Sequence, residues 1–117
     1  MLHIRPEQLA MLAESYLVAQ IADHLAEYLP AHHATLRPAA LREHIRDGII
    51  RAHGHGFDDG PSICLYVDLM FLFGREFDRE PWAAAILGDG ALLDDRELRA
   101  GQLRGAAIDR LNERSAS

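Results

Sequence analysis

The residues best suited to chemistry gather in a glycine-rich loop, where His53 and His55 are followed by Asp58 and Asp59. Imidazole nitrogens and carboxylate oxygens are good zinc ligands, so a metal-dependent enzyme built on this loop is one interpretation. Zinc sites need three or four converging ligands, and the helical histidine pair four residues apart that often supplies two of them is missing here. We therefore favour an exposed turn and predict neither a metal nor another cofactor.

Asp68 is the second candidate, because it interrupts an otherwise apolar run, Ile63–Phe73. An unpaired carboxylate is costly to bury, so Asp68 should face a gap at the surface or pair with Arg46, Arg51 or Arg75. A catalytic carboxylate is the alternative interpretation. It lacks a second carboxylate at a defined spacing, and the chain contains no nucleophile elbow. The sequence therefore predicts a protein that is not an enzyme.

The same apolar run dominates the architecture. A segment that is apolar all round must be surrounded by other elements, and as a helix it would span only about 16 Å, too little for a bilayer. Pro61 and Gly74 are start and stop signals, which predicts a buried central helix over residues 61–73; a buried strand is the alternative. The predicted structural core consists of Tyr66, Asp68, Met70, Phe71, Phe73, Phe77 and Trp82.

Apolar residues at helical spacing, together with start and stop signals, predict four further helices. They cover residues 6–29, 38–52, 81–87 and 94–112. The last helix should begin with Asp94 as its N-cap and Glu97 three residues later, and should bury Leu98. The expected fold is an all-α single domain over residues 1–117, a bundle of about five helices around the buried central helix 61–73.

Length and charge narrow the class of protein. A chain of 117 residues suits one domain, and 18 acidic against 12 basic residues, a net charge of −6, argue against a nucleic-acid binder. Cys64 is the single cysteine, so an intramolecular disulfide is excluded and a reducing compartment is indicated. The first residues do not resemble a signal peptide, and we expect a cytoplasmic protein that does not bind membranes.

Arginines form the polar side of the predicted second helix and the residues before it. They are Arg37, Arg42, Arg46 and Arg51. Such a face is usually solvated, but arginine is enriched at interface hot spots, so we predict a partner-binding surface for an acidic protein. A nucleic-acid-binding regulator is the alternative, which the acidic net charge disfavours. Gly101 and Gly105 allow close helix approach, which makes a homodimer conceivable.

Residues around the central helix also carry a family resemblance. They are Gly56, Phe57, Ile63, Tyr66, Asp68, Leu69, Met70, Phe71, Phe73, Gly74, Phe77, Asp78, Pro81, Trp82, Ala83, Ile86 and Leu87. This pattern resembles small helical proteins encoded among type VI secretion and PAAR-type effector genes of Gram-negative bacteria. The resemblance implies an adaptor, chaperone or immunity protein of the cytoplasm that binds a secretion effector or a spike-associated component. It brings no catalytic residues with it, and His53 and His55 stand where family members carry Arg and Tyr.

Overall fold

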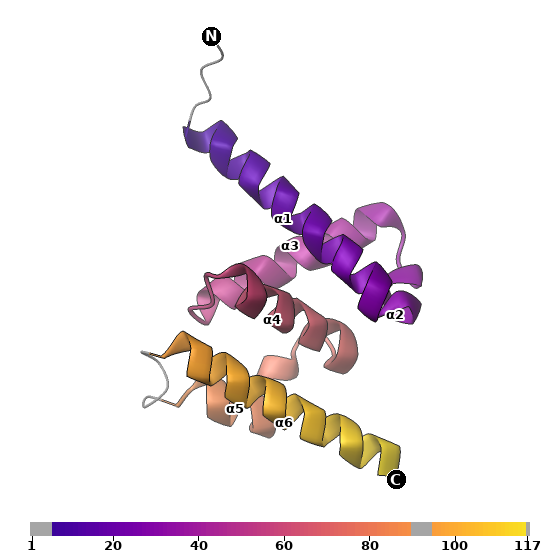
Figure 1. The fold of residues 1–117 in the computed structure, drawn as a ribbon, viewed down its shortest axis with the longest axis vertical. Helices are drawn as coiled ribbons and strands as arrows, with labels where there is room; N and C mark the ends of the chain where they lie inside the picture. Colours follow the sequence, from indigo (N-terminus) through magenta and orange to yellow (C-terminus); the bar gives the residue numbers. More distant parts are fainter. Residues whose placement is uncertain (1–5, 90–94, 117) are drawn as a thin grey trace. The chain divides into compact units, whose positions relative to one another are not determined.

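The computed structural model describes residues 6–89 and 95–116, and all regular elements in these ranges are helices (Figure 1). They are α1 (Pro6–Tyr28), α2 (Pro30–Ala34), α3 (Pro38–Gly54), α4 (Gly60–Phe73), the 3-10 turn η1 (Phe77–Arg79), α5 (Pro81–Leu87) and α6 (Arg96–Ala116). The all-α prediction is therefore confirmed for the described residues. The chain forms two compact units, Met1–Asp47 and Gly48–Ser117, and the boundary lies within α3.

In the first unit, α1 ends at Tyr28, before Pro30, as the proline predicts. Its buried side is formed by Val18, Ile21 and Leu25, which are spaced by three and four residues and thus share one face. Tyr16 is aromatic and lies on the same helix, but it is 66% exposed. The reason is geometric, since Tyr16 lies on the opposite side of the helix from Val18.

In the second unit, α4 begins with Asp59, whose carboxylate accepts a hydrogen bond from the Ser62 amide at 3.0 Å. This contact satisfies one of the amides left free at a helix start, and Pro61 needs no partner for its nitrogen. The helix ends before Gly74, whose φ of 107° suits glycine. Both ends agree with the predicted central helix to within one residue.

The predicted core residues differ in burial. Tyr66, Met70 and Phe77 are buried, whereas Asp68, Phe71, Phe73 and Trp82 are half-buried. The aromatic residues contact one another: the ring centroids of Tyr66 and Phe77 are 4.9 Å apart, and those of Phe73 and Trp82 are 5.1 Å apart. Edge and tilted contacts of this kind add to the stabilisation from apolar burial.

Helix α6 packs against α5 and α4 (Figure 1). Its inward side includes Ala100, Leu103 and Ala107, all buried. Leu98 was expected to be buried but is 49% exposed, because Arg99 takes the inward position beside it. The expected cap Asp94 lies outside the described residues, and Asp95 accepts a hydrogen bond from the Leu98 amide at 3.0 Å.

None of the helices in residues 6–89 and 95–116 combines the length and the apolar character needed to cross a membrane.

Candidate protein-binding surface

A hollow of about 460 Å³ opens in the first unit, alongside α1 and the start of α3. Its lining consists of Ser15, Val18, Ala19, Ala22, Asp23, His33, Leu36, Pro38, Leu41, Arg42 and Arg46. Ser15, Ala19 and Ala22 recur at helical spacing, so one strip of α1 carries only small side chains. The hollow therefore lies where α1 has too little side-chain volume to fill the space.

The lining is apolar at the bottom and charged at the edge. Val18 and Leu41 are buried at 2% and 5% exposure, and Leu36 is half-buried. Arg42 and Arg46 are exposed and one helical turn apart on α3. We call these lining residues the α1–α3 groove.

The two arginines of the groove are available to a partner. Arg46 Nε lies 3.5 Å from Glu14 Oε1, but both side chains are about half exposed, and ion pairs of this kind contribute little. Arg42 makes no hydrogen bond or ion pair with a residue that the structure describes. A carboxylate from outside could therefore bind here without displacing a strong internal contact.

The four arginines predicted to bind a partner do not lie on one common surface. Arg42 and Arg46 line the groove, while Arg37 is exposed just before α3 and is not part of the lining. Arg51 is half-buried in the second unit, where its charge acts on the carboxylate of Asp78. The small residues of α1 that form the hollow were not predicted from the sequence. Their recurrence at helical spacing was the signal that could have indicated them.

In the loop considered as a metal site, the side chains engage separate partners. His53 Nδ1 lies 3.0 Å from Asp58 Oδ1, and Arg96 Nη1 donates a hydrogen bond to Asp58 Oδ2 at 3.0 Å. Asp59 is occupied as the cap of α4. A cation already neutralises Asp58, so this carboxylate is poorly placed to be a metal ligand.

His55, the remaining member of that loop, turns towards a different carboxylate. Its Nε2 lies 3.1 Å from Asp78 Oδ2, and its ring is 5.6 Å from that of Tyr66. Burial by itself raises the pKa of Asp78, but the His55 hydrogen bond and the charge of Arg51 outweigh it and hold this pKa below its usual value. Asp78 is therefore a structural carboxylate that is ionised at neutral pH.

Arg99 is a buried cation that no pattern in the sequence indicated. It is 2% exposed, its guanidinium carbon lies 4.5 Å from the centroid of the Phe57 ring, and it donates a hydrogen bond to the carbonyl oxygen of His55. Burial and the nearby charge of Arg96 lower its pKa. Gly56 has a φ of 85°, and a Cβ there would lie 3.0 Å from Arg99 Nη2, so both the backbone and the packing favour glycine.

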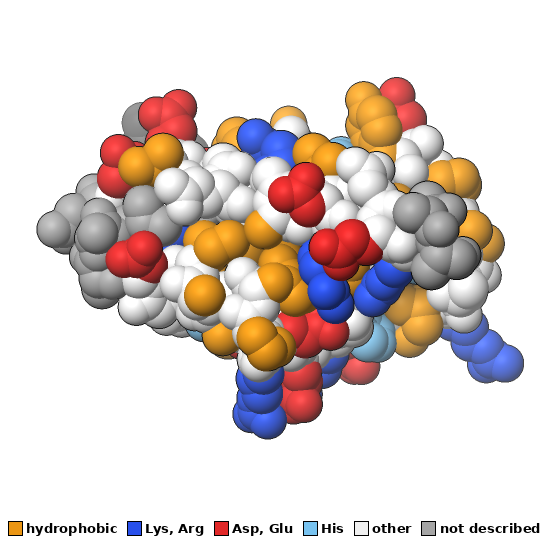
Figure 2. Space-filling view, turned by 90° about the horizontal axis from the view of Figure 1, so that it is seen from below, with side chains coloured by type: hydrophobic (Ala, Val, Ile, Leu, Met, Phe, Trp, Pro, Cys, Tyr) orange, Lys and Arg blue, Asp and Glu red, His pale blue; other side chains and the backbone are white. Residues whose placement is uncertain are grey.

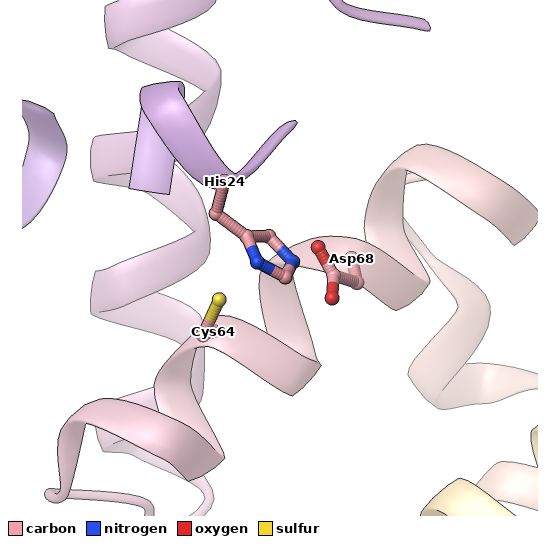
Figure 3. A group of neighbouring side chains, drawn as sticks. All are labelled: His24, Cys64 and Asp68. Carbon is pink, nitrogen blue, oxygen red and sulfur yellow. The ribbon is translucent and has the colours of Figure 1, made fainter. Parts of the chain in front are cut away.

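Cys64 and Asp68 lie one helical turn apart on α4 (Figure 3). Burial, and then the negative charge of Asp68, raise the pKa of the Cys64 thiol to about 11. The thiol is therefore protonated at neutral pH and a poor nucleophile. The expected pairing of Asp68 with an arginine stays a prediction.

A second hollow, of about 570 Å³, lies in the second unit beside the starts of α4 and α6. Its lining mixes acidic and basic side chains, among them Asp59, Asp95, Arg96, Glu97 and Arg104. Because the named acids and arginines nearly balance, its lining favours neither an anionic nor a cationic ligand. The α1–α3 groove carries two arginines and one acid, Asp23, beside an apolar bottom, so its lining has a net positive charge and favours an acidic partner.

No protein-family model matches the chain, and the comparisons with curated proteins and with solved structures give no match either.

Proposed function

We propose that the protein is a small accessory protein of the cytoplasm that binds another protein, as an adaptor, chaperone or immunity protein for a type VI secretion effector. The observation that carries the binding role is the α1–α3 groove, where an apolar hollow adjoins two exposed arginines. The link to secretion rests on the resemblance of residues 41–87 to small helical proteins of effector loci. We also propose that the helices form one cooperative bundle with α4 as its central helix.

The groove fits a partner segment with an apolar anchor followed by acidic residues. An apolar side chain that enters the hollow would cover Val18, Leu36 and Leu41, and burial of one Leu or Phe side chain is worth about 1.5–3 kcal/mol. Carboxylates next to the anchor would bind Arg42 and Arg46 through charge-assisted hydrogen bonds. The partner is thus defined by its chemistry as an acidic amphipathic segment, a helix being the simplest form.

The experiment is an affinity capture from the native host with three versions of the full chain as bait. They are the wild type, the groove variant Arg42→Glu and the control variant Arg79→Glu. Arg79 is exposed and lies in η1 of the second unit, so its reversal changes the net charge equally without touching the groove. We expect the wild type and the control to capture a stoichiometric protein encoded with secretion or toxin genes, and Arg42→Glu to bind it at least about tenfold more weakly.

Two results would contradict the proposal in different ways. If the captured partner has no connection to secretion or toxin genes, the functional assignment is wrong. If a secretion partner binds Arg42→Glu and the wild type equally, the function stands but the groove is not the binding surface. Circular dichroism of each variant shows that lost capture is not lost folding.

A further inference from the structure

The outer face of α6 carries large apolar side chains in contact with solvent. Leu98 is 49% exposed and Ile108 is 51% exposed, and the exposed Gly101 and Gly105 lie between them on the same face. Figure 2 shows hydrophobic side chains on the surface among acidic and basic ones. Single exposed aliphatic residues are common on protein surfaces, so these two gain significance only from their spacing on one helix face.

The spacing on this face is that of a helix pair. Leu98, Gly101, Gly105, Ile108 and Asn112 are separated by three, four, three and four residues. This is the alternation of the two inward positions in a two-helix coiled coil. A Cβ built on Gly101 or Gly105 meets no atom within 4 Å, so the space above both glycines is open. A second helix could therefore approach α6 closely at its middle.

The charges beside the stripe are complementary under two-fold symmetry. Arg104 and Asp109 lie on opposite flanks of the stripe, both are exposed, and neither pairs with a described residue. In a parallel pair of α6 helices, Arg104 of one copy comes next to Asp109 of the other, and the symmetry repeats this contact on the second flank. Asn112 would meet its own counterpart at an inward position, where asparagine is known to specify helix register.

We propose that α6 is a self-association surface, on which a second copy of this chain binds in parallel through the stripe from Leu98 to Asn112. The contact is short, two heptads, and buries less area than the roughly 1,200 Å² typical of stable complexes. The dimer is therefore concentration-dependent and weak, with a dissociation constant on the order of 10–100 µM. The surface is separate from the α1–α3 groove, so this proposal does not depend on the proposed function.

Sedimentation equilibrium of the full chain tests it. The weight-average mass of the wild type should rise from 13.1 kDa towards twice that value as its concentration approaches about 1 mM. Arg104→Glu places acids opposite each other, and Asp109→Arg places arginines opposite each other, so each variant alone should dimerise at least about tenfold more weakly. An equimolar mixture of the two variants restores opposite charges on both flanks and should recover dimerisation.

The mixture distinguishes a specific contact between Arg104 and Asp109 from a general effect of net charge. A second variant, Gly105→Gln, adds a side chain where a Cβ meets no atom within 4 Å, so it should weaken the dimer while leaving the fold intact. A wild type that keeps the monomer mass up to about 1 mM overturns the proposal. A dimer that tolerates all three substitutions would also overturn the proposal. The same holds if the mixture fails to recover association. Circular dichroism confirms that each variant is folded.

Discussion

The guanidinium group of Arg99 lies over the Phe57 ring, with Cζ 4.5 Å from the ring centroid, so α6 holds the loop that leads into α4. The same side chain donates a hydrogen bond to the carbonyl oxygen of His55. Forty-four residues of sequence separate the two hydrogen-bond partners. This contact therefore ties two distant segments of the second unit together, and it does so with a cation that is 2% exposed.

Replacing Arg99 by Ala should destabilise the protein by roughly 2–4 kcal/mol. The substitution removes the stacking on Phe57, leaves the His55 carbonyl without its donor and opens a cavity. Urea unfolding followed by circular dichroism measures the change. Arg96→Ala is the matched control, because Arg96 is an exposed residue whose surface pair with Asp58 should contribute less than about 1 kcal/mol. Equal effects of the two substitutions would mean that Arg99 has no special structural role.

Asp78 should make stability depend on pH in the acid range. Its folded pKa is lowered, so its contribution is fully present above the unfolded value of about 4 and is lost as the pH falls through the folded pKa. We expect Asp78→Asn to cost about 1.5–3 kcal/mol at pH 7, the worth of hydrogen bonds to a charged group. The difference from the wild type should shrink below about pH 4.

The pH dependence is checked by measuring unfolding free energies from pH 2 to pH 7. The proteins compared are the wild type, Asp78→Asn and the exposed control Asp58→Asn. The control should show a much smaller difference at neutral pH, since Asp58 is 61% exposed. A wild-type advantage over Asp78→Asn that stays constant down to pH 2 would show that the carboxylate charge is not what stabilises the site.

Gly48→Ala should destabilise the second unit, although alanine is the better helix former by about 1 kcal/mol. A Cβ on Gly48 would lie 2.8 Å from Val67 Cγ2 and 3.1 Å from Met70 Sδ, which forces α3 and α4 apart. Overpacking of this kind costs about 1–3 kcal/mol. In thermal unfolding, Gly54→Ala serves as the control, because its Cβ meets nothing within 4 Å. A melting temperature of Gly48→Ala at or above that of the wild type would show that the two helices adjust freely.

Cys64 should resist alkylation in the folded protein. With the pKa of its thiol at about 11, the reactive thiolate is roughly 200-fold scarcer at pH 8 than for a free cysteine of pKa about 8.5. Iodoacetamide labelling followed by mass spectrometry gives the rate, and labelling of the urea-unfolded chain is the reference. The folded rate should rise with pH beyond pH 9. Folded and unfolded rates that agree at pH 8 would show an accessible, ordinary thiol.

Helix positions were largely predictable because local signals determine them. Pro30, Pro38, Pro61 and Pro81 all lie where a helix must end or begin, and the structure begins α2, α3 and α5 at three of them. The last helix was predicted to have Asp94 as its N-cap, whereas Asp95 makes the capping hydrogen bond in the structure. Asp94 and Asp95 are adjacent, and both are residue types able to cap a helix. Propensity cannot choose between two equivalent neighbours.

The side that each helix buries was less predictable. Leu98 was expected inside because it is apolar, yet Arg99 and Ala100 occupy the inward positions and Leu98 is 49% exposed. Hydropathy alone assigns an arginine to the surface, whereas contacts with the Phe57 ring and the His55 carbonyl offset part of the cost of burying Arg99. The same limit applied to the loop histidines, whose partners Asp58 and Asp78 became clear only in three dimensions.

By itself, the sequence determined that this chain is helical, where most of its helices begin and end, and that Cys64 forms no disulfide with another cysteine of the chain. These properties follow from backbone geometry and composition, which act over a few residues. The tertiary structure alone decided that small residues of α1 leave a groove beside Arg42 and Arg46, and that Arg99 is buried on Phe57. Both depend on contacts between distant segments, where packing volume and desolvation, rather than residue type, determine which side chain faces inward.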